Sequence, residues 1–172
     1  TTLQVLGTVE LRRADGGSVQ SVAVQPKRLA LLCYLAAARP RGPHRRDTLL
    51  ALLWPDLGAE RARAALSKAV HHLRMSLGAD AITSRGEDAL ELDPAVVTSD
   101  VTAFEMALRE ERLADALALY GGDLMHGFNL SDAPEFERWL DAERERLRQL
   151  AARAARGLSN AAESGGEVAE AA

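Results

Sequence analysis

The sequence of 172 residues is poor in cysteine and in aromatic residues, and it lacks long apolar runs. Its one cysteine, Cys33, cannot form a disulfide within the chain and lies in an apolar run, so we expect a small buried side chain in a reducing compartment. No apolar run reaches the length of a membrane span, and no signal peptide opens the chain. We therefore expect a cytoplasmic protein. Aromatic residues make up only 4% of it, so aliphatic residues and alanine must build the core.

Patterns typical of enzymes and metal sites are also missing. No serine lies in a nucleophile-elbow motif, and the glycine pairs at 16–17 and 121–122 lack the lysine and the spacing of a phosphate-binding loop. The histidines are His44, His71, His72 and His126, without metal-ligand spacing. Adjacent histidines on a helix diverge by about 100°, so His71 and His72 would share one metal poorly. We expect no enzymatic activity, no cofactor and no metal.

Charge is unevenly distributed along the chain. Residues 26–78 hold ten basic and three acidic residues, a net charge of +7. Residues 79–100 sum to −5 and residues 101–172 to −6, which gives the whole chain its net charge of −4. A basic block inside an acidic chain is typical of a surface that contacts nucleic-acid phosphates. The acidic remainder should repel DNA and so serve another purpose.

The strongest helical pattern, over residues 60–77, lies within the basic block. Its buried stripe is expected to be Ala62, Leu66, Ala69, Val70, Leu73 and Leu77. Its outer face would carry Arg61, Arg63, Ser67, Lys68, His71, His72 and Arg74. Such a helix can lie in the major groove of DNA, with its apolar face on its own domain. The alternative is an ordinary surface helix with a solvated basic face.

The elements around this helix follow the order of a winged helix-turn-helix. Strands are expected over residues 3–11 and 18–24, separated by the turn signal Asp15-Gly16-Gly17. Two further helices are expected, at 26–38 and 45–53. A hairpin follows, with runs at 81–84 and 89–92 around Gly86. Arg85 would stand at its tip, either to reach DNA or as a solvated loop residue.

From about residue 99 onward the pattern is helical, over 101–110, 112–120 and 134–162. Gly165-Gly166 is expected to break the last helix, after which 167–172 would start another. The apolar stripe of the long helix is Phe136, Trp139, Leu140, Leu147, Leu150, Ala154 and Leu158. Its charged residues Glu143, Arg144, Glu145, Arg146 and Arg148 are most simply a solvated face with i,i+4 pairs. Paired helices of this kind indicate a helical-repeat module.

Several motifs along the chain match one known family. They are Leu52 to Asp56 (LLWPD), Ala62 to Leu66, Leu73-Arg74, Tyr120 to Leu124, Gly127-Phe128, Asp132 to Phe136, Trp139-Leu140 and Glu143 to Leu147. With these motifs the chain closely resembles the SARP-type bacterial transcriptional activators. Members of that family join an OmpR-type winged-helix DNA-binding domain to a bacterial transcriptional activator domain of tetratricopeptide-like helices.

The resemblance implies an α+β winged-helix domain at 1–95 and an all-α activator domain at 99–172, cut short at its C-terminal end. It implies a regulator that binds direct repeats in promoter DNA, with a second copy in tandem, and contacts RNA polymerase. The expected DNA-binding residues are Arg45, Arg46, Arg61, Arg63, Ser67, Lys68, His71, Arg74 and Arg85. All but Arg85 follow from the family's recognition helix and the helix before it. The alternative function is a protein-interaction module with little DNA binding of its own.

Overall fold

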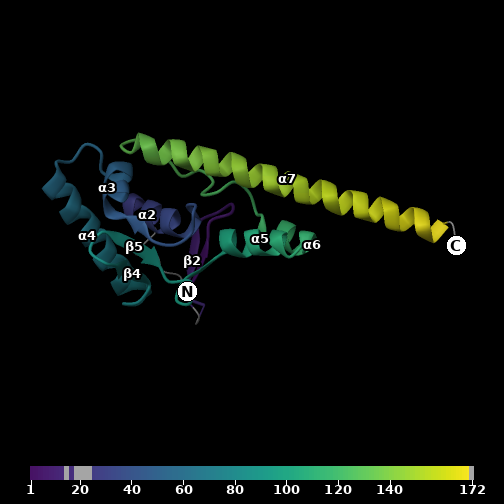
Figure 1. Cartoon of the computed structure of the whole chain (residues 1–172), viewed down its shortest axis with the longest axis horizontal. Coiled ribbons are helices and arrows are strands. Elements are labelled where there is room, and N and C mark those ends of the chain that lie inside the picture. The colour runs from purple at the N-terminus through teal and green to yellow at the C-terminus, as the bar shows by residue number, and fades with distance from the viewer. Residues whose placement is uncertain (14–15, 18–24, 171–172) are drawn as a thin grey trace.

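The computed structural model describes residues 1–13, 16–17 and 25–170, so the strand expected over 18–24 lies outside the described residues. In chain order the elements are β1 (Thr2–Gln4), β2 (Glu10–Arg12), α2 (Pro26–Ala37), β3 (His44–Arg45), α3 (Arg46–Leu53), α4 (Ala59–Leu77), β4 (Ile82–Arg85), β5 (Ala89–Leu92), β6 (Thr98–Ser99), α5 (Asp100–Arg109), α6 (Leu113–Leu119) and α7 (Pro134–Glu170). Helices α2, α3 and α4 gather at one end of the molecule, and α7 runs along its length (Figure 1).

Helix α2 is the centre of the first half. It begins at Pro26, where the missing N–H of proline costs no hydrogen bond, and most of its side chains are buried. Helix α4 buries the six residues of the expected stripe, so its predicted orientation is confirmed. It ends at Gly78, whose φ of +117° is a backbone conformation that side chains other than glycine rarely adopt.

Two small sheets complete the first half. The expected hairpin is confirmed as β4 and β5, which pair antiparallel with Ile82 opposite Leu92, and β3 adds a third strand on the other side of β5. The single strand expected over residues 3–11 is wrong, because this segment forms two short strands, β1 and β2, which pair antiparallel with each other in the other sheet. The parallel partner of β1 is β6, with Leu3 opposite Ser99. The sequence did not predict β6, because two residues are too short a run to show alternation.

The helical second half packs directly on the first. The buried carboxylate of Asp100, at the start of α5, accepts hydrogen bonds of 2.8 Å from the backbone N–H groups of Val5 and Leu6. Burial raises the pKa of Asp100, and these hydrogen bonds act in the opposite direction. A second contact between the halves is aromatic: the ring centres of Tyr34 in α2 and Trp139 in α7 lie 4.7 Å apart. One continuous hydrophobic core therefore spans both halves.

Helix α7 is longer than expected. It continues through Gly165-Gly166 to Glu170, so the predicted break is wrong. Glycine lowers helix propensity by about 1 kcal/mol but keeps its N–H, so the backbone ladder can continue. Beyond α6 the helix projects from the body of the molecule (Figure 1), and Leu158, expected in the apolar stripe, is 40% exposed. Within the described residues, no helix is both long and apolar enough to cross a membrane.

The charged residues of α7 are not all solvated, which corrects a second expectation. Glu143 is buried, and Arg144 donates hydrogen bonds to the carbonyl oxygens of Leu124, Met125 and Phe128. The ion pairs along this helix join residues three apart, as in Glu143–Arg146, rather than four apart. Arg144 is held because the loop before α7 presents its carbonyl groups to it, and Glu143 is paired with Arg146.

Glu105 of α5 joins three separate segments. Its buried carboxylate pairs with Arg39 at 3.2 Å, with Arg41 at 2.7 Å and with Arg146 of α7 at 2.6 Å. Burial raises the pKa of Glu105, but the hydrogen bonds and charges of Arg41 and Arg146 outweigh it, so the net effect is a lowered pKa. The loop after α2, α5 and α7 are thereby tied together at one carboxylate.

Candidate nucleic-acid interface

The outward face of α4 carries most of the residues expected to bind DNA. Arg61, Arg63, Ser67, Lys68 and His71 are all exposed, on the face opposite the buried stripe and on one flank of it. This separation follows from the 3.6-residue period of the helix. Met75 lies toward the end of the same helix and is 73% exposed. The structure thus brings these five residues together on one helix, open to solvent.

Arg74, also on α4, has a different environment. Its side chain is half-buried, and its Nε donates a 2.7 Å hydrogen bond to the carbonyl oxygen of Ile82 in β4. This contact fastens the β4–β5 hairpin to the last turns of α4. Helical spacing alone places Arg74 near the outer face and gives no sign of the strand that it meets.

The start of α3 places two further arginines beside the hairpin. Arg45 is the N-cap residue of α3; it is exposed and lies 3.9 Å from the carboxylate of Asp47. Arg46 is half-buried, because its backbone N–H donates to the carbonyl of Asp88 and its Nη2 donates to the hydroxyl of Ser84. Arg45 therefore extends into solvent beside Asp47, whereas Arg46 is held against the hairpin.

A groove between α3, α4 and the hairpin turn collects residues from all three elements. It is lined by Arg46, Asp47, Leu50, Arg63, Leu66, Ser67, Glu87 and Asp88. Arg46, Arg63 and Ser67 are thus neighbours in space, as a binding surface requires. The sequence pattern places the acids Glu87 and Asp88 in the hairpin turn but does not predict that they line this groove. They give one side of the groove a negative charge.

Arg85 does not occupy the tip of the hairpin. It is the last residue of β4, and the turn itself is formed by residues 86–88. Its Nε lies 2.6 Å from a carboxylate oxygen of Glu91 on β5, although the side chain remains 65% exposed. A contact between Arg85 and a phosphate would have to compete with this ion pair.

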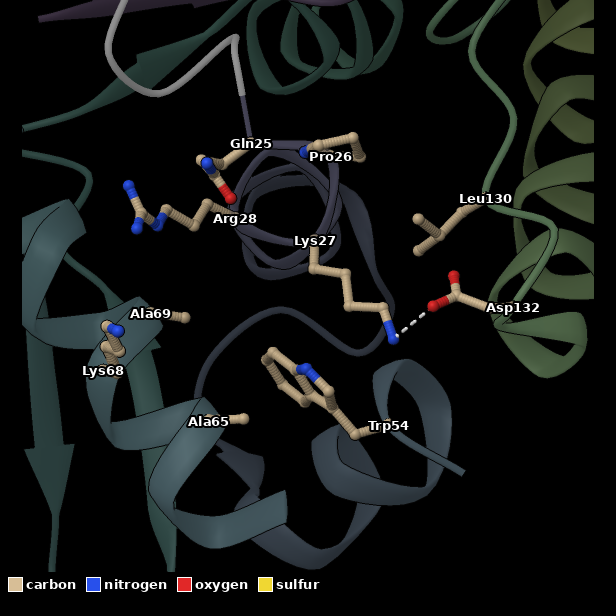
Figure 2. A pocket seen from close by; sticks show the side chains of 10 residues that line it. All are labelled: Gln25, Pro26, Lys27, Arg28, Trp54, Ala65, Lys68, Ala69, Leu130 and Asp132. Carbon is tan, nitrogen blue, oxygen red and sulfur yellow. Dashed lines mark ion pairs between the residues drawn. The ribbon is translucent and has the colours of Figure 1, made fainter. Parts of the chain in front are cut away.

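A basic cleft of about 440 Å³ lies beside α4, where α2 begins. Figure 2 shows the ammonium group of Lys27 between the ring of Trp54 and the carboxylate of Asp132. Lys27 Nζ lies 2.8 Å from Asp132 Oδ2 and 5.9 Å from the centre of the Trp54 ring. Arg28 and Lys68 line the same cleft.

Arg28 extends the basic surface of α4 onto α2, a link that the sequence alone did not reveal. Burial lowers the pKa of His72, and the charges of Arg28, His71 and Lys68 lower it further. The positive side chains of the two helices are therefore close enough to act on one another. The only signal in the sequence was the membership of Arg28 in the basic block.

Comparison with known proteins identifies the fold. No family model and no curated protein matches the chain. The chain is similar to Mycobacterium tuberculosis EmbR, whose structure was solved in complex with a low-affinity phosphopeptide. The TM-score is 0.61 at 23% identity, over 98% of this chain and 49% of the EmbR chain. This chain thus spans about half the length of EmbR and shares its fold over that half.

Proposed function

We propose that this chain is a SARP-type transcriptional regulator that binds duplex DNA. The observation that carries the proposal is the surface of α4, which buries one stripe of residues and leaves Arg61, Arg63 and Lys68 exposed to solvent. The order of α2, α3, α4 and the β4–β5 hairpin is that of a winged helix, with α4 as its recognition helix. The fold shared with EmbR and the sequence motifs support the same class.

Within this proposal the exposed residues have two roles. Arg61, Arg63, Ser67, Lys68 and His71 face the major groove, where arginine and lysine can read base edges as well as phosphates. Arg28, which lines the cleft beside α4, and Arg45, which is exposed at the start of α3, are proposed to contact the DNA backbone. The anchored residues Arg46, Arg74 and Arg85 shape the surface, and their remaining N–H groups can still reach phosphates at its edge.

The helical region 99–172 is proposed as a tetratricopeptide-like activator domain that contacts RNA polymerase. Its net negative charge argues against a second DNA-binding surface. Two copies would bind in tandem on direct repeats of a promoter, which requires no dimer in solution.

A protein-interaction module is the competing function. The acids Asp47, Glu87 and Asp88 beside the groove favour it, because they oppose the approach of phosphates. The projecting end of α7 favours it as well, since it offers an exposed helix to a partner (Figure 1). A measurement of DNA binding decides between the two functions.

Selection from a random duplex pool, followed by a salt series on the enriched sequence, tests the proposal. Enrichment of a repeated short motif would establish specific binding and its spacing. Affinity should fall steeply between about 50 and 200 mM salt, with a slope near 0.9 for each phosphate neutralised. The absence of any retarded duplex at low salt would exclude the DNA-binding function.

Substitutions on α4 make the test residue-specific. Arg63→Ala and Lys68→Ala should each weaken binding by roughly tenfold, while changing the free energy of unfolding by no more than about 0.5 kcal/mol. Arg153→Ala is the matched control, because it removes an exposed arginine of α7 far along the chain from α4. A large fall in the melting temperature of either α4 variant would mean that the replaced side chain supports the fold instead.

A further inference from the structure

The two flanks of α4 differ in charge. On the flank toward α2, the basic cleft is lined by three basic residues and one acid, Lys27, Arg28, Lys68 and Asp132. On the flank toward α3 and the hairpin turn, the groove is lined by two arginines and three acids, Arg46, Arg63, Asp47, Glu87 and Asp88. A DNA strand carries a negative charge at every phosphate, so it is attracted to the first flank and opposed at the second.

Two of the cations in the basic cleft have no counter-ion. Neither Arg28 nor Lys68 has an ion-pair partner among the described residues, and Lys68 is exposed to solvent. Figure 2 shows both side chains on the side of the cleft away from Asp132. They lie close together, because the charges of both lower the pKa of His72. Two neighbouring cations without an acid repel each other, and an anion bound beside them relieves that repulsion.

The third cation, Lys27, is already paired with an acid from the helical half of the chain. Its Nζ lies 2.8 Å from Oδ2 of Asp132, which stands in the loop just before α7 (Figure 2). The side chain of Asp132 is 55% exposed. An ion pair that is open to water contributes little to stability, so a stronger anion can take the place of the carboxylate.

We propose that the basic cleft binds the DNA backbone and that Asp132 competes with a DNA phosphate for Lys27. This proposal rests on the DNA binding proposed for α4. One phosphate contacts Arg28 and Lys68, and another phosphate of the same strand replaces Asp132 at Lys27. Because Asp132 belongs to the loop before α7, binding of DNA breaks a contact between the two halves. The helical half thereby lowers the affinity of the chain for DNA.

Equilibrium binding to the duplex enriched by selection tests the unpaired side of the cleft. Arg28→Gln should weaken binding about tenfold near 150 mM salt and lower the salt slope by about 0.9, the value for one phosphate. Arg28→Lys keeps the charge and should retain the wild-type slope. The matched control Arg156→Gln removes an exposed arginine of α7 and should change neither quantity. The melting temperature of each variant, measured alongside, shows that the fold is retained.

Substitution of Asp132 tests the competition. Asp132→Asn should raise the affinity about threefold, in line with the weakness of a partly exposed ion pair. The matched control Glu135→Gln removes the same charge three residues along the chain, at an exposed position outside the cleft, and should leave the affinity unchanged. In the background of Lys27→Gln, Asp132→Asn should give no gain, because no cation remains for which the acid competes.

The outcomes separate this proposal from the proposed function. If the wild type retards no duplex, DNA binding and the role of the cleft are both excluded. If the wild type binds, but Arg28→Gln behaves as Arg156→Gln or Asp132→Asn behaves as Glu135→Gln, only the proposal for the cleft is overturned. A gain from Asp132→Asn that persists without Lys27 overturns it too, since the acid then acts on DNA through its charge alone.

Discussion

Glu105 shows how one side chain can join segments that are far apart in the chain. Its partners Arg39 and Arg41 precede it by more than sixty residues, and Arg146 follows it by 41. A carboxylate with three arginines around it is favoured in the ionised form even when it is buried. The contact therefore contributes to stability only while Glu105 is charged.

Replacing Glu105 by glutamine should lower the free energy of unfolding by about 2–3 kcal/mol at neutral pH. This value lies below the range of about 3–5 kcal/mol for breaking a fully buried ion pair, because Arg41 and Arg146 are partly exposed. Urea denaturation measures it. Glu110→Gln is the control, because its pair with Arg112 lies on the surface and should contribute less than about 0.5 kcal/mol.

The same variant should change the acid sensitivity of the protein. Because the pKa of Glu105 is lowered in the folded state, its stabilising effect is complete above the ordinary value of 4.5 and is lost as the pH falls through the folded pKa. The difference in stability between wild type and Glu105→Gln should therefore shrink below about pH 4.5. A difference that stays constant into acid would show that the charge of Glu105 is not responsible.

At the scale of elements, α4 and the β4–β5 hairpin behave as one unit because Arg74 connects them. Arg74 and Arg63 were both assigned to DNA binding from the sequence, but only Arg63 is exposed. The hydrogen bond to Ile82 gives Arg74 a structural role in addition.

Arg74→Ala should lower the free energy of unfolding by about 1–2 kcal/mol, since it removes a charge-assisted hydrogen bond to a backbone carbonyl. Hydrogen exchange at the amides of β4 and β5 should become faster at the same time. Arg63→Ala, which removes an exposed arginine of the same helix, should leave both quantities unchanged. Equal behaviour of the two variants would rule out the fastening role.

Features within one element could be predicted from the sequence, whereas contacts between elements could not. The buried stripe of α4 was predicted residue by residue, because a 3.6-residue period needs no knowledge of the rest of the fold. The same reasoning could not find the partners of Arg74, Arg85 or Glu105, since each lies on another element. It also placed Glu143 and Arg144 on a solvated face, because the irregular loop that accepts hydrogen bonds from Arg144 could not be predicted from helical spacing. The predicted break at Gly165-Gly166 was wrong because it overestimated the effect of glycine within a long helix.

At the scale of the whole molecule, the two halves are joined across the predicted boundary at residues 95–99. Strand β6 pairs with β1, Asp100 binds the backbone of Val5 and Leu6, and Leu6 forms an isolated bridge with Leu124. The predicted domains at 1–95 and 99–172 remain a proposal about function. Their shared core favours unfolding as a single unit.

Truncation tests this coupling. A chain of residues 1–95 should lose cooperative thermal unfolding, because it lacks β6, Asp100 and the helix α7 that packs on α2 and α3. Deletion of residues 163–172 should leave the melting temperature unchanged, since residues 158–163 of α7 are already exposed. Calorimetry of the full chain should give one transition. Two separate transitions, or a stable 1–95 fragment, would contradict the shared core.

The length of α7 has a mechanical consequence. A helix of 37 residues is about 55 Å long, and its first turns pack on α3, next to the proposed recognition helix. Its far end stands clear of the body (Figure 1). Helix α7 is packed well beyond its first turns, because Leu147, Ala151 and Ala154 are buried and Arg146 pairs with Glu105 of α5. The helix is therefore a rigid arm, which holds its exposed end in a set direction relative to the helices on which it packs.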